Sequence, residues 1–408
     1  MRTPYLLLLA CATAACGADM PARDALIAVV DTVDGVERLS YPADAATPLP
    51  WRFDTLAVIG GALVEDENYQ FQDVGRARLA GNAEGHLFVL DGQGERILRY
   101  DETGTFVRSY GREGSGPGEL RMPVSIALGP GDSLWVPDMM NRRITIFDPA
   151  GAGSRIIGDA DQGMNMSGVS LGGSSYYRTG EMFMVGARTE GQGHPLVPLV
   201  RYALDGVPLD TVWRHQPPPT TTVRFQLGGV PVTRQLRPAY APVFRWAPLS
   251  DGRVVVSDSA NYVLHIVLPD GTIERTIQRD PPARPVTEAD KDAARERERN
   301  LPVPRLPGIP ADAQEFRNKG AENMTFAATI PRITALLIDA KDRIWVGVSV
   351  DKPETTERID VYDAAGRLLG EIRDPAFFPD LLYGPDLAAL LRQDEFDVQQ
   401  VVVMRVVE

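Results

Sequence analysis

Three arginines have the residue type and spacing to bind an anion. Arg78 and Arg245 lie 167 residues apart, which is also the distance between two copies of a sequence repeat, so both occupy the same place in their copies. Arg76 precedes Arg78 by two residues and, in a strand, projects to the same side. Three guanidinium groups on one surface suit carboxylates or phosphates, because each presents a planar fork of donors. The alternative is that they form ion pairs with acidic neighbours from adjacent copies of the repeat.

Acidic residues also recur at one place in the repeat. Asp91, Asp138 and Asp258 each end a short apolar run. They could form a ring of carboxylates, but we favour a structural role, in which each accepts backbone N–H bonds from the turn that follows. The histidines are scattered and show no metal-ligand spacing: His86, His194, His215 and His265. His265 lies in an alternating stretch and is expected to be a packed core residue. The tryptophans are also expected to pack in the core and not to contact a cofactor: Trp51, Trp135, Trp213, Trp246 and Trp345. No nucleophile or phosphate-loop motif is present, so no catalytic and no metal-binding residue is assigned.

The elements that position these residues come from an internal repeat. Residues 86–104 and 133–151 match at a constant offset of 47, which aligns Gly104 with Gly151. Each copy reads as short strands separated by turns, and an upstream strand over residues 76–80 completes a set of four. Four antiparallel strands in roughly 40–50 residues are typical of a propeller blade, which needs neighbours on both sides to bury its faces.

Further copies end at Gly206, Gly271 and Gly366. The copy that ends at Gly206 is looser: a glycine- and serine-rich loop over residues 159–175 leads into it, and residues 181–187 are predicted to form its second strand. A sixth blade is composite, because residues 51–59 and 397–407 each read as a strand and can pair to close the ring. The sequence therefore predicts an all-β fold, a six-bladed β-propeller over residues 51–408. The innermost strands of a propeller line its central channel, so Arg76, Arg78 and Arg245 are predicted to bind an anion there.

The repeat resembles that of NHL-repeat six-bladed β-propellers, especially the bacterial lipoprotein versions. The resemblance rests on WVPD at residues 135–138, NRRI at 141–144, FD at 147–148 and the interblade segment GREGSGPGEL at 111–120. It covers nearly all of the chain after Trp51. It implies the fold and leaves the activity open, because propellers of this kind are enzymes, scaffolds and binding modules.

Two segments depart from the repeat. Residues 281–323 form the larger insertion, in which Thr287 and Asp290 resemble a capping pair that opens a charged helix over residues 288–299. A hidden seventh blade is the alternative, but the stretch lacks an alternating run, so an inserted helix and loop are favoured. This helix could also act as a lid. Residues 217–241 form the other insertion, with a predicted hairpin around Gly228 and Gly229.

The N-terminus reads as a targeting segment. Residues 1–15 have the short basic start and apolar core of a signal peptide, followed by Cys16 as the predicted lipid-attachment site. Cys11 is the alternative site, and ordinary secretion with cleavage near Ala15 is the alternative fate. Residues 16–50 are predicted to be a flexible tether. Gly17 after the modified cysteine favours an outer-membrane destination facing the periplasm.

The net charge of −13 argues against a nucleic-acid partner. Three function classes remain. The first is an envelope-anchored module that binds a protein or a small anionic ligand without catalysis or cofactor. The second is a metal-dependent lactonase-like or lyase-like enzyme, with a divalent cation such as calcium in the central channel. The third is a sensor of a periplasmic ligand.

Overall fold

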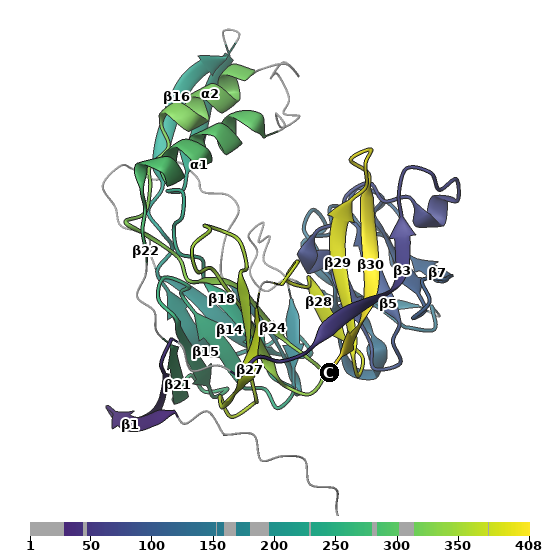
Figure 1. The fold of residues 1–408 in the computed structure, drawn as a ribbon. Coiled ribbons are helices and arrows are strands. Elements are labelled where there is room, and N and C mark those ends of the chain that lie inside the picture. Colours follow the sequence, from purple (N-terminus) through teal and green to yellow (C-terminus); the bar gives the residue numbers. More distant parts are fainter. Residues whose placement is uncertain are drawn as a thin grey trace, which may run out of the picture.

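The chain forms a six-bladed β-propeller, as the repeats predict (Figure 1). The computed structural model describes residues 28–43, 47–151, 153–158, 169–179, 196–227, 230–279, 284–301, 314–373 and 375–408. Each blade contains four antiparallel strands, and the first strand of each set lies innermost. The signal peptide and Cys16 lie outside the described residues.

The strands of the blades are as follows. Blade 1 contains β4 (Leu79–Gly81), β5 (Leu87–Asp91), β6 (Arg96–Tyr100) and β7 (Phe106–Tyr110). Blade 2 contains β8 (Ala127–Leu128), β9 (Leu134–Asp138), β10 (Arg143–Phe147) and β11 (Ser154–Gly158). Blade 3 contains β12 (Ser170–Gly172), β13 (Ser175–Thr179), β14 (Val197–Ala203) and β15 (Pro208–His215). Blade 4 contains β18 (Arg245–Pro248), β19 (Val254–Ser257), β20 (Val263–Val267) and β21 (Ile273–Arg279). Blade 5 contains β24 (Ile333–Ile338), β25 (Ile344–Val348), β26 (Arg358–Tyr362) and β27 (Leu368–Arg373). Blade 6 contains β28 (Leu381–Tyr383), β29 (Leu387–Gln393), β30 (Gln399–Val407) and β3 (Arg52–Gly60). Short 3-10 turns are η1 (Glu67–Tyr69), η2 (Arg76–Arg78) and η3 (Pro130–Asp132).

The ring closes through blade 6, as predicted. β3 pairs antiparallel with β30, from Arg52 opposite Val407 to Gly60 opposite Gln400. The innermost strands contact one another in order around the ring, and β28 contacts β4 to complete it. This pairing satisfies backbone groups that would otherwise form two open sheet edges.

The turn glycines of the repeat have the backbone geometry that their spacing predicts. All five lie at positive φ, between 72° and 97°: Gly104, Gly151, Gly206, Gly271 and Gly366. Each donates its N–H to the carbonyl oxygen three residues earlier, at 2.8–3.0 Å. These turns join the third strand of a blade to the fourth, and they lie together on one face of the propeller, which we call the bottom face. The turns between second and third strands and the connections between blades lie on the opposite, top face.

The core lies between the blades. Trp135 and Trp345 occupy the same place in the second strands β9 and β25, and both are completely buried. Trp135 packs on Tyr176 of blade 3, and Trp345 packs on Trp51 beside blade 6. Each tryptophan therefore fills the space between its own blade and the next, which confirms the packing role expected from the sequence.

Blade 3 uses different residues for one strand than the repeat suggests. The prediction placed its second strand within residues 181–187, which lie outside the described residues. The second strand is β13, where Tyr176 pairs with Tyr202. A turn at Gly173 and Ser174 joins β12 to β13 in a short hairpin, where the sequence predicts a loop.

The prediction of a flexible tether over residues 16–50 is wrong for its second half. β1 (Val29–Val33) and β2 (Val36–Tyr41) form a hairpin, and β2 adds to blade 4 parallel to β21. Asp34 and Gly35 have φ of 52° and 82°, the geometry of a type I′ hairpin turn. The structure is ordered here because Leu39 and Tyr41 are buried against blades 4 and 5.

The two insertions fold together into one accessory subdomain above the top face (Figure 1). It contains the hairpin β16 (Thr221–Leu227) and β17 (Val230–Leu236), the pair β22 (Arg284–Pro285) and β23 (Thr329–Ile330), and the helices α1 (Glu288–Asn300) and α2 (Gln314–Glu322). The hairpin is confirmed by its pairing, and the helix over residues 288–299 is confirmed with its Thr287–Asp290 capping box. The second helix, α2, was not predicted.

Ion pairs and a small core hold the subdomain together. Glu298 of α1 is nearly buried and lies 2.7 Å from Arg234 of β17 and 3.2 Å from Arg317 of α2. Arg234 also lies over the ring of Phe316, 4.7 Å from its centroid. Below them, the Tyr240 hydroxyl donates to the Asp290 carbonyl oxygen at 2.8 Å. Segments more than 50 residues apart in the chain thus form one unit.

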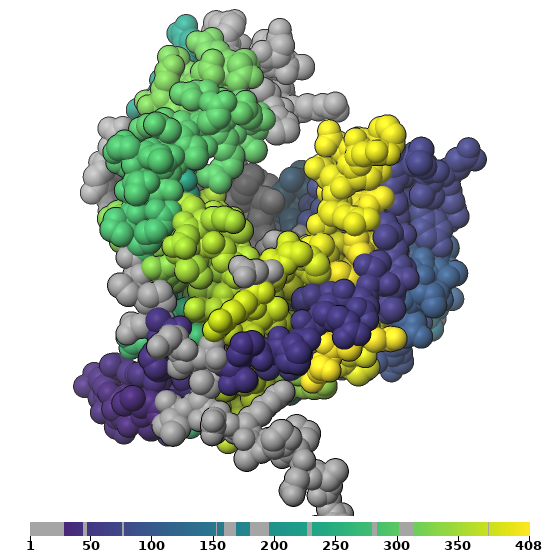
Figure 2. Space-filling view, viewed as in Figure 1, coloured from purple at the N-terminus to yellow at the C-terminus, as the bar shows by residue number. Residues whose placement is uncertain are grey.

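The accessory subdomain stands over one side of the propeller. Figure 2 shows a hollow between its helices and the projecting end of the β29–β30 hairpin. Among the described residues, none of the helices has the length and apolar character needed to span a bilayer.

Candidate ligand-binding site

A pocket of 460 Å³ opens between blades 3 and 4, at the foot of the accessory subdomain. Its walls come from the end of β15, from β20 and the turn before it, and from the two arms that carry the hairpin β16–β17. Pockets of this volume are typical of small-molecule sites. It lies away from the propeller axis, because β15 is the outermost strand of its blade.

Aromatic rings form two layers in this pocket. Trp213 stacks on His265, with centroids 5.3 Å apart, and His215 stacks on Phe244 at 4.2 Å. Trp213 and His215 are two residues apart in β15, so both project to the side that faces blade 4. Trp213, Phe244 and His265 remain partly exposed, whereas Trp135 and Trp345 in other interblade spaces are completely buried, so this pocket has accessible flat walls.

The imidazole of His265 is held in one state. Its Nδ1 lies 3.0 Å from the Thr276 hydroxyl. Burial lowers the pKa of His265, and the nearby Arg38 lowers it further, against the opposing charge of Asp258. This side chain is therefore neutral at pH 7. The sequence predicted a packed core residue, and the structure shows a half-buried ring that packs on Trp213 and lines the pocket.

Charged and polar groups complete the lining. Arg214 and Arg237 are exposed, and within the described ranges neither side chain makes a hydrogen bond or an ion pair. Asp258 accepts the Ala260 N–H at 3.1 Å, and Asn261 lies beside it on the blade 4 side.

The carboxylates of the repeat act as structural caps, as predicted. Asp91 is fully buried, and its Oδ1 accepts N–H bonds from Gln72, Asp73 and Gly94 at 3.1–3.3 Å. Asp138 accepts from the Arg121 N–H at 2.8 Å and from the Asn141 side chain at 2.7 Å. These carboxylates anchor the chain that enters each blade as well as the turn that follows.

The predicted channel arginines occupy different environments. Arg76 and Arg78 belong to η2, not to a strand, so the alternation used to place them on one side does not apply there. The Arg78 guanidinium donates to the carbonyl oxygen of Asp73 at 2.9 Å and pairs with its carboxylate. Arg245 is the first residue of β18 and follows Phe244 of the pocket. Anion binding by these three arginines stays a prediction.

The described residues contain no group of three or more histidine, cysteine, aspartate or glutamate side chains close enough to hold a metal ion. The rings and polar groups of the pocket offer stacking and hydrogen bonding.

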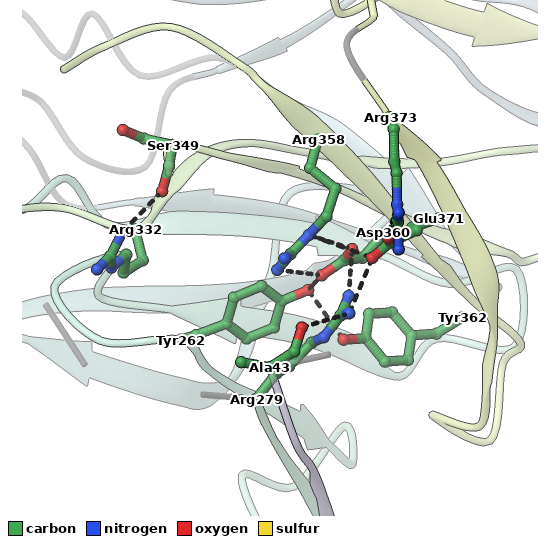
Figure 3. A network of polar contacts seen from close by, with 10 residues as sticks. All are labelled: Ala43, Tyr262, Arg279, Arg332, Ser349, Arg358, Asp360, Tyr362, Glu371 and Arg373. Carbon is green, nitrogen blue, oxygen red and sulfur yellow. Dashed lines mark hydrogen bonds and ion pairs between the residues drawn. The ribbon is translucent and has the colours of Figure 1, made fainter. Parts of the chain in front are cut away.

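A buried polar network joins blades 4 and 5 (Figure 3). Arg279 has no exposed side-chain surface; its Nη1 lies 2.5 Å from Asp360, and its Nη2 lies 2.8 Å from Glu371. Arg358 lies 2.8 Å from Asp360, and the Tyr262 hydroxyl donates to the same carboxylate at 2.7 Å. Burial raises the pKa of Glu371, but its bonds to Arg279 and Arg373 outweigh burial, so its pKa lies below the usual range.

Sequence reasoning missed this network and most of the pocket. The network depends on contacts between blades, which the repeat does not encode. Trp213 was interpreted as packing, and Arg214 and Arg237 were not singled out. The one available signal was that residues 217–241 depart from the repeat, because functional sites often lie where a regular scaffold is interrupted.

Six four-stranded blades, their five turn glycines and the closure through β3 and β30 define an NHL-like six-bladed β-propeller. No family model matches the chain. A stretch of 67 residues, 16% of the chain, is 30% identical to the human NHL repeat-containing protein 3 and covers 19% of that protein. The chain thus spans about a fifth of the length of this curated relative.

Solved structures include propellers of similar extent. A protein from Bacteroides fragilis is 9% identical, with a TM-score of 0.48 over 91% of this chain and 100% of that one. A member of the DUF4221 family from Bacteroides vulgatus is 10% identical, with a TM-score of 0.48 over 88% and 99%. A virginiamycin B lyase from Staphylococcus aureus is 12% identical, with a TM-score of 0.36 over 81% and 80%. Identities this low carry no information about substrate or partner.

Proposed function

We propose that this chain is a ligand-binding propeller, held at the bacterial cell envelope by a lipid on Cys16, that binds its ligand on the top face. The observation that carries the proposal is the pocket at the foot of the accessory subdomain. It combines stacked rings with Arg237, whose side chain makes no hydrogen bond or ion pair within the described residues. A guanidinium group can stack on an aromatic face and can bind a carboxylate or phosphate through two hydrogen bonds.

The accessory subdomain supports the same proposal. Both arms of the hairpin β16–β17 border the pocket, through Gln216 and Pro218 of one arm and Arg237 and Val243 of the other. Folding these inserted residues costs about 1–2 kcal/mol of backbone entropy for each residue. An insertion that stays folded despite this cost is expected to serve a function. Arms that shape the pocket walls give the subdomain such a function.

Binding is tested by thermal unfolding of the purified protein with a panel of small organic acids, bases and neutral molecules. The proposal requires that at least one class raises the midpoint, and that Trp213→Leu abolishes the rise. The matched control is Phe396→Leu, because Phe396 is exposed at the far end of the β29–β30 hairpin. No ligand-dependent rise, or a rise that survives in Trp213→Leu, refutes it.

Envelope attachment is tested separately, by growing cells with labelled palmitate. We expect the label on the wild-type chain and on Cys11→Ser, and its loss in Cys16→Ser. Label that is lost only in Cys11→Ser moves the anchor to Cys11. An unlabelled wild-type chain refutes lipid attachment and leaves the binding proposal intact. Elemental analysis of the same preparation tests the metal-dependent lactonase or lyase alternative, which requires a bound divalent cation.

A further inference from the structure

We infer that the top of blade 6 is a docking surface for a positively charged segment of a partner protein that also carries apolar side chains. This surface consists of the loop after β3, residues 61–67, and the turn between β29 and β30, residues 394–397, and we call it the blade 6 surface. The end of the β29–β30 hairpin projects from the top face at this place (Figure 1). The inference does not depend on the pocket between blades 3 and 4.

Two large apolar side chains are exposed together on the blade 6 surface. Leu63 is 85% exposed, more than any other large apolar side chain among the described residues, and Phe396 is 58% exposed. Both line one pocket of 250 Å³, together with Val64. A single exposed apolar side chain is ordinary, but two that line the same pocket form a larger apolar area, and such areas mark interaction sites.

A second pocket adjoins the first. It has a volume of 640 Å³ and shares three residues of the loop with the smaller pocket: Gly61, Ala62 and Val64. Its other walls come from η1, from the segment that follows η1 and from the start of β6. Two adjoining hollows accept successive side chains of one peptide segment, whereas the body of a small molecule would fill only one of them.

The charge around these pockets is negative. Of the two nearby arginines, Arg96 donates to the carbonyl oxygens of Glu67 and Gln70 at 2.9 and 3.0 Å, and Arg392 donates to the Gln400 side chain at 3.0 Å. The loop and the turn carry six carboxylates: Glu65, Asp66, Glu67, Asp394, Glu395 and Asp397. This excess of negative charge complements lysine and arginine side chains of a partner, and it repels nucleic acid and an anionic membrane surface.

Asp394 holds the two parts of the blade 6 surface together. Its Oδ2 accepts the Ala62 N–H at 2.7 Å, and its Oδ1 accepts the N–H groups of Phe396 and Val398 at 2.9 and 3.0 Å. Because the loop and the turn are already bound to each other, a partner docks without the full cost of ordering them. The described residues contain no carboxylate group that could hold a metal ion, so the complement is the distributed charge of a peptide.

The probe is a heptapeptide of alternating lysine and leucine, blocked at both ends and labelled for fluorescence anisotropy with the full purified protein. One companion peptide replaces lysine by glutamate, and the other replaces leucine by serine. We expect the lysine–leucine peptide to bind. Each companion should bind at least tenfold more weakly, because the first reverses the charge and the second removes the apolar side chains.

One pair of variants tests the apolar contact. The double substitution Leu63→Ser with Phe396→Ser should weaken binding of the lysine–leucine peptide at least tenfold. Leu209→Ser is the matched control, because Leu209 is an exposed apolar residue of β15 in blade 3, and it should leave the affinity unchanged. Unchanged far-ultraviolet circular dichroism verifies that each variant is folded.

A second pair separates the local charge from the net charge of the chain. Glu65→Lys, Glu67→Lys and Glu395→Lys together change the net charge by three times two, from −13 to −7, and should weaken binding at least tenfold. The control makes the same change in net charge at exposed sites elsewhere and should weaken binding much less. Its substitutions are Glu84→Lys, Glu113→Lys and Glu315→Lys.

Four outcomes of these titrations overturn the inference: no binding of the lysine–leucine peptide, equal binding of either companion, wild-type affinity in the double variant, or equal losses in the two triple variants. Equal losses would mean that only the net charge attracts the peptide. Sedimentation velocity adds a fifth. A dimer that is lost in the double variant would show that a second copy of this chain covers the surface. None of these results bears on ligand binding through Trp213.

Discussion

Arg279 of blade 4 and Asp360 of blade 5 form an ion pair in which neither side chain has any exposed surface, with 2.5 Å between Nη1 and Oδ1. Arg358 and the Tyr262 hydroxyl reach the same carboxylate, and Glu371 takes the second nitrogen of Arg279. The pair therefore connects the last strand of one blade to the third strand of the next. Elsewhere among the described residues the contacts between blades are mostly apolar, so this seam is the most polar part of the described ring interior.

Asp360→Asn should strongly destabilise the protein. The substitution leaves the buried charge of Arg279 with only Glu371 as a counter-ion, and breaking a buried pair in this way costs about 3–5 kcal/mol. Equilibrium urea unfolding gives the loss. Asp54→Asn is the control, because Asp54 pairs with Arg52 on the surface, with side chains 50% and 64% exposed, and should change stability far less. Similar losses in the two variants would contradict the role of this seam.

A series of glycine substitutions should separate backbone strain from steric contact. Gly131 has φ of 64° and open space where a Cβ would lie, so Gly131→Ala should cost about 1 kcal/mol from the left-handed conformation alone. Gly271 has φ of 89°, and its Cβ would lie 3.1 Å from the Thr211 carbonyl oxygen, so Gly271→Ala should cost more. Gly153→Ala, with neither feature, should be neutral or slightly stabilising. Thermal unfolding ranks the three, and any other order refutes the turn geometry.

The accessory subdomain should loosen in acid. Hydrogen bonds from Arg284 and Thr287 hold the pKa of Asp290 well below its usual range, against the opposing effect of burial. The charged form thus stabilises the fold fully above the unfolded pKa of about 3.9, and that contribution is lost as the pH falls toward the folded value. Hydrogen exchange of α1 at pH 7 and pH 3 should show the loss in the wild type. Asp290→Asn should show weaker protection at pH 7 and less change with pH.

The connection between blades 1 and 2 should open when Asp138 is removed. Arg143 lies 3.3 Å from Asp138 and donates to the carbonyl oxygens of Ser115, Gly116 and Glu119, so the carboxylate orients the side chain that holds this loop. Asp138→Ala should speed trypsin cleavage after Arg112 and Arg121 in the native state. Asp258→Ala is the control, because it removes only the exposed hydrogen bond from the Ala260 N–H. In this variant the rate of cleavage after Arg112 and Arg121 should equal that of the wild type.

Much of the fold could be predicted because local chemistry repeats. A glycine at positive φ and an aspartate that caps a turn are dictated by a few neighbouring residues, so their spacing reveals the blades. Closure through β3 and β30 followed because a propeller leaves no open sheet edge. The hairpin β1–β2 also had a local signal, Asp34–Gly35 between alternating residues, which was overlooked because the segment follows a predicted anchor.

The site was harder to predict because it depends on long-range packing. Arg78, just before β4, and Arg245, the first residue of β18, occupy equivalent places in the repeat. Arg78 nevertheless forms an ion pair with Asp73, and no sequence pattern predicts that partner. The pocket needs Trp213 and His265, 52 residues apart, to stack across the space between two blades. It also needs an arm of the accessory subdomain to bring Arg237 to the same place. None of these residues has a counterpart in the other blades.

The N-terminal segment crosses three blades in succession. β2 pairs with blade 4, Leu49 donates its N–H to the Glu371 carbonyl oxygen of blade 5 at 2.7 Å, and β3 completes blade 6. A mechanical load applied ahead of Val29 would have to unzip the β1–β2 hairpin and then strip β2 before any tension reached the closing strand. The pairing of β2 with blade 4 and the bond between Leu49 and Glu371 therefore shield the ring closure from a load at that end.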